Sequence, residues 1–227
     1  MRRFMGPSRL WGSQEGPDKD WVKPHVLWLP QDQPQVMGYF GRLRQVVDSF
    51  PDVIAPIADE DVHMTIQSVR QFNTKGARVD DEQLALAAGL IQRELEGMAP
   101  FDIEIGPARA VGSASVVDIW PQAGPAELNR RVRAGLEAAG MALPPAEEVF
   151  WCHMSCGYGV QDTDTPELAA RSDKFASKIG KSILCGRALA QINKVWLVWE
   201  QQHPQRSTYT FERKHILHLR GSELIRP

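Results

Sequence analysis

The chain has 227 residues, of which 43% are hydrophobic and 24% charged, and this average composition excludes a collagen-like, low-complexity or wholly disordered protein. The chain has 26 Lys and Arg and 28 Asp and Glu, which gives a net charge of -2. It therefore lacks the excess of basic residues typical of proteins that bind the phosphates of long nucleic acids. Three cysteines are too few for a disulfide framework, and no apolar run reaches the roughly 18 residues of a membrane helix, so we expect a cytoplasmic protein without membrane spans.

The first half of the chain predicts alternating strands and helices after a short lead-in. Residues 1–22 are rich in Gly, Pro and charge, which predicts a flexible segment. The apolar run His25-Val-Leu-Trp-Leu is typical of a strand, and Pro30-Gln-Asp-Gln-Pro and an amphipathic helix that ends near Ser49 follow it. The next segments predict a strand over 61–69, a helix over 81–97 and a strand over 101–105.

The same order of elements repeats in the second half. Ser115-Val-Val-Asp-Ile-Trp is again a strand pattern, and Pro121-Gln-x-x-Pro follows it, 91 residues after Pro30. His153-Met-Ser-Cys lies 90 residues after His63-Met-Thr-Ile, so two separate features give nearly the same offset. The other elements predicted here are a helix with Leu128, Val132 and Leu136 on its apolar face, a strand over 149–157, a helix over 166–180, a strand over 194–200 and an extra strand over 208–219.

Two copies of strand–helix–strand–helix–strand predict an α+β fold with two pseudo-symmetric lobes around a central cleft. Duplicated halves commonly pack about a pseudo-two-fold axis, which brings their equivalent strands face to face. We therefore expect residues 23–227 to form one bilobed domain, with a first repeat over about 25–106 and a second over about 114–219. Two unrelated α/β units are the alternative interpretation.

Two of the predicted strands carry a histidine and a hydroxyl two residues apart. Because alternate residues of a strand share a face, His63 and Thr65 point one way, and so do His153 and Ser155 on the second strand. If these faces converge on one cleft, the four groups suit a phosphodiester. One imidazole can take a proton from the nucleophile while the other protonates the leaving oxygen, because imidazole titrates near neutral pH. The hydroxyls can donate to the non-bridging phosphoryl oxygens.

His63-Met-Thr-Ile and His153-Met-Ser-Cys resemble the paired His-hydrophobic-Thr/Ser-hydrophobic signatures of the 2H phosphoesterase superfamily, in particular its 2'-5' RNA ligase-like and cyclic phosphodiesterase branches. The resemblance extends from about residue 25 to residue 219. It implies two similar lobes with both motifs facing a cleft, and metal-free cleavage of 2',3'-cyclic phosphates or phosphodiesters in a nucleotide or short RNA. It also implies that His63 and His153 are the acid–base pair and that Thr65 and Ser155 bind the phosphate.

The sequence departs from the family pattern beside both motifs. Many members have Pro directly before the motif histidine, where this chain has Val62 and Cys152. Many also have Arg shortly after the second motif, where this chain has Gly157, Tyr158 and Gly159. No catalytic group is lost, so the departures bear on the substrate. Tyr158 is a candidate substrate contact that can stack on a base or bind a phosphate, although a core position is its simpler interpretation.

Other candidate sites are weaker. Cys152, His153 and Cys156 resemble a zinc cluster in spacing only, because on a strand the two cysteines face away from the histidine. No Gly-rich phosphate loop is present, so no dinucleotide or ATP site is expected. The family resemblance implies that no metal is needed, and no cofactor is expected. His25 is interpreted as structural. The chain has seven tryptophans, most of which we expect in the core, and one at the mouth of the cleft could stack on a nucleobase.

The sequence therefore predicts a metal-independent phosphodiesterase that acts on a 2',3'-cyclic phosphate or a 2'-5' phosphodiester by a two-histidine mechanism. Two alternatives remain open. One is the same catalytic pair acting on a small metabolite or a cyclic oligonucleotide, and the other is a nucleotide- or RNA-binding module without turnover. The near-neutral charge argues against a general RNA binder.

Overall fold

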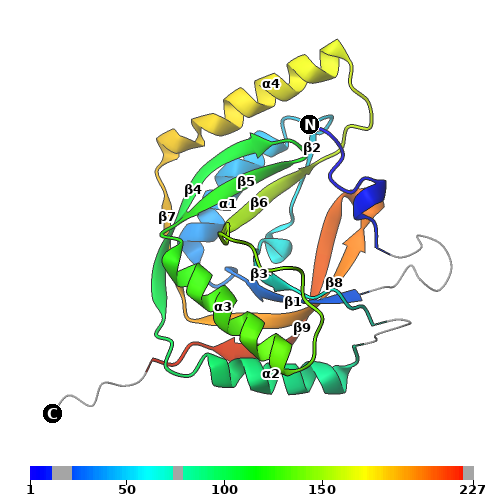
Figure 1. The fold of residues 1–227 in the computed structure, drawn as a ribbon. Coiled ribbons are helices and arrows are strands. Elements are labelled where there is room, and N and C mark those ends of the chain that lie inside the picture. Colours follow the sequence, from blue (N-terminus) through cyan, green and yellow to red (C-terminus); the bar gives the residue numbers. More distant parts are fainter. Residues whose placement is uncertain (12–21, 74–78, 222–227) are drawn as a thin grey trace.

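The computed structural model describes residues 1–11, 22–73 and 79–221, and within them nine strands form one curled sheet with helices packed on it (Figure 1). The α+β class predicted from the sequence is confirmed. No helix of these residues is long and apolar enough to cross a bilayer. The helices are α1 (Pro34–Val47), α2 (Asp81–Glu94), α3 (Ala123–Ala138) and α4 (Pro166–Gly180), with short 3-10 turns η1 (Pro7–Arg9), η3 (Asp59–Asp61), η4 (Lys181–Cys185) and η5 (Pro204–Arg206). The strands are β1 (Val22–Trp28), β2 (Ile54–Pro56), β3 (Met64–Ser68), β4 (Phe101–Val111), β5 (Ala114–Trp120), β6 (His153–Gly159), β7 (Ala188–Ile192), β8 (Lys194–His203) and β9 (Thr208–His218).

The strand order of the sheet intermixes the strands of the two repeats. It runs β7-β4-β5-β6-β3-β1-β8-β9, with β2 paired to β6. The strands that carry or follow the two histidine motifs, β3 and β6, are therefore central neighbours, and β1 and β5 flank them. The strand expected third in each repeat pairs with the first strand of the other repeat, β4 with β5 and β8 with β1. The two halves of the sheet thus do not coincide with the repeats 25–106 and 114–219.

Two helices cover each half of the sheet. α1 and α4 pack on the β6 half, made of β7, β4, β5 and β6, whereas α2 and α3 pack on the β3 half, made of β3, β1, β8 and β9 (Figure 1). Each helix buries the apolar face that its period of 3.6 residues creates. In α1 this face consists of Val36, Tyr39, Phe40, Leu43 and Val47.

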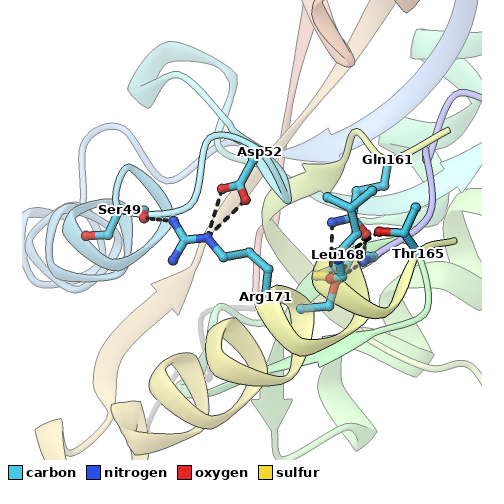
Figure 2. A network of polar contacts seen from close by, with 8 residues as sticks. Ser49, Asp52, Gln161, Thr165, Leu168 and Arg171 are labelled. Atoms are coloured by element: carbon cyan, nitrogen blue, oxygen red, sulfur yellow. Dashed lines mark hydrogen bonds and ion pairs between the residues drawn. The ribbon is translucent and has the colours of Figure 1, made fainter. Parts of the chain in front are cut away.

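α4 is fixed at its start and along its length. Thr165 caps the helix, since its side chain accepts a hydrogen bond from the Leu168 amide at 3.3 Å. Figure 2 shows Arg171 reaching from α4 to the chain that follows α1, where Nε binds the Asp52 carboxylate at 2.9 Å and Nη2 donates to the Ser49 carbonyl at 2.9 Å. These contacts join α4 to the α1 side of the β6 half.

The first part of the expected flexible lead-in lies against the sheet. In residues 1–11 the Phe4 amide donates to the Gly159 carbonyl at the end of β6, and Met5 is only 2% exposed. Phe4 and Met5 supply apolar surface that outweighs the Gly and Pro content of the segment. Residues 12–21, the rest of the expected lead-in, lie outside the described residues.

Two strand predictions differ from the structure in their bounds. The strand expected over 149–157 begins only at His153, and Val149 is 73% exposed in the preceding loop. β7 precedes the strand expected over 194–200 and was not predicted, because the alanines of Ala188-Leu-Ala-Gln-Ile give it weak strand propensity. Its pairing with β4 makes it a strand.

Candidate functional site

The two histidine motifs meet at the centre of the sheet. β3 and β6 pair antiparallel with the methionine of one motif opposite the methionine of the other, and both methionines are buried in the core. Because neighbouring residues of a strand point to opposite faces, His63, Thr65, His153 and Ser155 share the other face. The register sets His63 beside Ser155 and Thr65 beside His153. The structure thus brings the four predicted residues into one group, called here the motif cluster.

Both histidines are oriented by the same kind of hydrogen bond. His63 Nδ1 donates to the Asp61 carbonyl at 2.7 Å, and His153 Nδ1 donates to the Trp151 carbonyl at 3.0 Å. A carbonyl oxygen only accepts, so each neutral ring carries its hydrogen on Nδ1 and keeps Nε2 available to a ligand. An imidazole held in this way can act as a general base when neutral and as a general acid when protonated.

The loop before His63 is held by the glutamine of the first Pro-Gln-x-x-Pro segment. Gln31 Nε2 lies 3.2, 3.2 and 2.8 Å from the carbonyl oxygens of Asp59, Glu60 and Val62 and donates to them. These residues directly precede the motif histidine. The segment after β1 therefore positions the start of β3.

Burial controls the protonation of His63 and its neighbourhood. Burial is the largest effect and lowers the pKa of His63, while the charge of Glu200 and the hydrogen bond to the Asp61 carbonyl act in the opposite direction. Burial also raises the pKa of the Asp61 carboxyl to about 6, and the charge of Glu60 adds to the rise. The environment of His63 therefore favours its neutral form.

The motif cluster lines a pocket of about 550 Å³, a size that suits a nucleotide. A smaller pocket of about 160 Å³, with Asn129 and Arg133 in its wall, adjoins it at Thr65, Trp151 and His153. The two pockets together form the candidate substrate cleft. The other polar and aromatic residues in the wall of the larger pocket are Phe4, Arg9, Trp11, His25, Ser68, Ser113, Trp151, Tyr158, Glu200 and Tyr209.

Tyr158 and Trp151 form aromatic walls of the pocket. Tyr158 is 5% exposed and stacks on Phe4 with ring centroids 4.3 Å apart, so it is a core residue whose edge also lines the pocket. Burial raises its pKa well above the ordinary value, so the phenol remains a neutral hydrogen-bond donor. Trp151 is 41% exposed, and its ring stacks on His153 at a centroid distance of 4.1 Å. The Arg109 guanidinium also lies over this ring, 5.5 Å from its centroid.

A buried contact between a histidine and a carboxylate in the pocket wall was not predicted. His25 Nδ1 and Glu200 Oε2 lie 2.6 Å apart, and their side chains are only 8% and 7% exposed. The sequence alone gives His25 a structural role and gives Glu200 none. The two residues meet because β1 pairs with β8, and no local pattern signals that pairing.

The two cysteines of the second motif face the core, as the alternation of a strand predicts. Cys152 and Cys156 are buried, and burial raises the pKa of Cys152 to about 12 and that of Cys156 to about 11. Both thiols therefore stay protonated. In the part of the chain that the structure describes, no group of three or more His, Cys, Asp or Glu side chains is placed to hold a metal ion.

Comparisons with known proteins identify the fold. No protein-family model matches the chain, and no curated protein matches it by sequence. A solved protein of unknown function, ATU0111 from Agrobacterium tumefaciens, shares 13% identity at a TM-score of 0.62, over 91% of this chain and 92% of that chain. A solved phosphoesterase shares 13% identity at a TM-score of 0.58, over 88% and 98% of the two chains. E. coli LigT complexed with 3'-AMP shares 11% identity at a TM-score of 0.57, over 88% and 99%.

At these identities the likeness establishes the fold. The chain has the fold of LigT and of this phosphoesterase along most of its length. LigT has also been solved with ATP, with NADP+ and with phosphate.

Proposed function

We propose that the protein is a metal-independent phosphodiesterase that hydrolyses a 2',3'-cyclic phosphate or a 2'-5' phosphodiester of a nucleotide or short RNA. The observation that carries the proposal is the motif cluster, with His63, Thr65, His153 and Ser155 on one face of two paired strands in a pocket of about 550 Å³. The fold shared with a phosphoesterase and with LigT supports it, as do the nucleotides bound to LigT.

His63 is the general base and His153 the general acid in the hydrolysis of a cyclic phosphate. Burial lowers the pKa of His63, so its Nε2 is free at neutral pH to take a proton from water. The water oxygen bonds to phosphorus, the bond from phosphorus to one ribose oxygen breaks, and protonated His153 gives its proton to that oxygen. The product is a nucleoside monophosphate. His63 then releases its proton to solvent and His153 takes one up.

The two hydroxyls of the motif cluster bind the phosphoryl group. Thr65 and Ser155 each lie beside the histidine of the other motif, and all four residues line the same pocket. Their O–H groups donate to the non-bridging oxygens, whose negative charge must be held during in-line displacement. The partly exposed ring of Trp151, which contacts His153 and the Arg109 guanidinium, offers apolar contact surface to the attached nucleobase.

Hydrolysis of 2',3'-cyclic AMP and of a short 2'-5'-linked oligoribonucleotide, both in EDTA, tests the proposal. We expect turnover by the wild type and a loss of about 10²-fold or more in kcat for His63→Ala and for His153→Ala. His215→Ala is the matched control, because His215 lies on β9 and is not among the pocket residues. Activity that EDTA abolishes and a divalent ion restores would refute the mechanism. A wild type that binds nucleotides without cleaving them would favour a binding module.

A further inference from the structure

Residues 1–11 form a strap that runs from the end of β6 towards β8 and β9 (Figure 1). Phe4, Arg9 and Trp11 of this strap line the pocket of the motif cluster. The first part of the strap is held at the end of β6, where the Arg3 amide donates to the Gln161 carbonyl at 2.8 Å and the Phe4 amide donates to the Gly159 carbonyl at 2.9 Å. The Gln161 side chain in turn contacts the start of α4 (Figure 2). Gly159 permits this approach, because a Cβ there would overlap the backbone of the strap.

The other part of the strap is held by β8. Gln202 is 7% exposed, and its amide group binds the strap twice: Nε2 donates to the Arg9 carbonyl at 2.9 Å, and Oε1 accepts from the Trp11 amide at 2.9 Å. β6 and β8 belong to different halves of the sheet. The strap therefore joins the two halves and fixes the backbone of Arg9 at the wall of the pocket that contains both motif histidines.

Arg9 is oriented by an aromatic contact and a hydrogen bond. Its guanidinium lies over the Phe4 ring, 4.4 Å from the centroid, and Nη1 donates to Ser113 Oγ at 3.3 Å. Among the described residues it forms no ion pair, whereas Arg2 and Arg3 of the same strap each bind an aspartate, at 2.5 and 2.6 Å. An exposed guanidinium in this state presents most of its N–H donors to an anion.

Arg9 also lies where two pockets meet. The pocket of the motif cluster and a neighbouring pocket of about 590 Å³ share Phe4, Arg9, Gly112 and Ser113 in their walls. A ligand whose phosphodiester lies at the motif cluster therefore has room to extend past Arg9. The charge of Arg9 favours an anionic group on that extension.

We propose that Arg9 binds a second phosphate of the substrate, so that the enzyme prefers nucleotides or oligonucleotides with a phosphate on the far side of the nucleoside that carries the scissile group. The inference rests on the proposed function, because it takes the motif cluster as the site of the scissile phosphate. Guanidinium suits this role, since its planar fork can bind two phosphate oxygens at once.

Binding of two nucleotides tests the proposal: 3'-AMP, which carries one phosphate, and adenosine 3',5'-bisphosphate, which carries two. We expect the wild type to bind the bisphosphate about tenfold more tightly than 3'-AMP. This factor is the gain in affinity that one charge-assisted hydrogen bond gives in a partly hydrated site. Arg9→Ala should reduce this ratio of dissociation constants to near one. Arg9→Lys keeps the charge without the fork and should give an intermediate ratio.

Arg130→Ala is the matched control, because it also removes one positive charge but lies on the solvent side of α3, paired with Glu127. It should keep the wild-type ratio, and thermal melts of all variants check that they fold. A wild-type ratio near one, a ratio that survives in Arg9→Ala, or failure to bind either nucleotide would overturn the proposal. If the ratio depends on Arg9 but 2',3'-cyclic AMP is not hydrolysed, the Arg9 site stands and the proposed hydrolysis fails.

Discussion

Glu200 is a buried carboxylate that favours the protonated form of His63. Glu200→Gln keeps its shape and removes its charge, so we expect the pKa of His63 to fall further and the acidic limb of the kcat/KM profile to move to lower pH. The variant also leaves His25 without its charged partner, and we expect a loss of about 2 kcal/mol in the free energy of unfolding. Glu212→Gln, exposed on β9, is the control for loss of a negative charge. An acidic limb that stays in place in Glu200→Gln would show that this carboxylate does not act on His63.

Asp61 provides a test of pH-dependent stability. Burial raises its pKa to about 6. A group whose pKa is higher in the folded than in the unfolded state stabilises the fold below its unfolded pKa, and this contribution is lost as the pH rises through about 6. Asp61→Asn keeps the backbone carbonyl that orients His63 and removes the charge. We expect its free energy of unfolding at pH 7.5 to exceed that of the wild type by on the order of 1–2 kcal/mol, with a smaller difference near pH 4.

Urea unfolding at the two pH values measures this effect. Asp59→Asn is a control, because the Asp59 carboxylate is largely exposed and binds Arg44. A variant at position 61 that gains no stability at pH 7.5 would mean that the carboxyl of Asp61 ionises in the folded protein without penalty.

The residues of the pocket differ in how far the sequence predicts them. The motif cluster is predictable because a period of two puts each histidine and hydroxyl on one face, and the duplication gives the same signal twice. The positions of Arg9, His25 and Glu200 in the pocket cannot be predicted in this way. Arg9 comes from the strap, His25 from β1 and Glu200 from β8. Arg9 is held at the pocket by the contacts of the strap with β6 and with Gln202, and His25 and Glu200 are brought there by the pairing of β1 with β8.

At the scale of elements, local signals give the helices more accurately than the strands. α4 spans 166–180 as predicted, because Thr165 supplies a cap and Pro166 favours the first turn. β2 and β7 have no comparable signal. The three residues of β2 and the alanines of β7 become strands only by pairing with β6 and β4.

Two helical glycines test how closely α2 and α3 cross. Gly135 of α3 faces α2, and a Cβ there would lie 2.6 Å from the Ile91 Cα. Gly135→Ala therefore pushes the helices apart, and we expect a loss of about 1–3 kcal/mol in the free energy of unfolding despite the better helix propensity of alanine. Gly89→Ala in α2 has no atom within 4 Å of the added Cβ and should gain about 0.5–1 kcal/mol. Urea unfolding of the wild type and both variants measures these differences. If Gly135→Ala were as stable as Gly89→Ala, the close crossing of α2 and α3 would be contradicted.

The whole sheet is built from strands exchanged between the two repeats. β4 follows the first repeat's helices but pairs with β5 and β7, and β8 pairs with β1. Neither repeat therefore contains a complete half of the sheet. The duplication in the sequence predicts the elements and the α+β class, but the exchange depends on contacts distant in sequence, which no local pattern records.

This exchange leads us to propose that residues 23–227 fold as one unit, and a split chain tests it. The chain can be divided at the turn between β4 and β5, at Gly112 and Ser113, into fragments 1–112 and 113–227. Each fragment alone exposes strand edges and core side chains that its own residues cannot cover, so we expect neither to give a near-UV circular dichroism signal or protected amides. Mixing the fragments should restore both signals, because the two together supply complete halves. Intact chain with a protease site inserted at the same turn controls for local disruption and should stay folded until cut. Protected β1 and β3 amides in 1–112 alone would show that the repeats, and not the exchanged halves of the sheet, are the folding units.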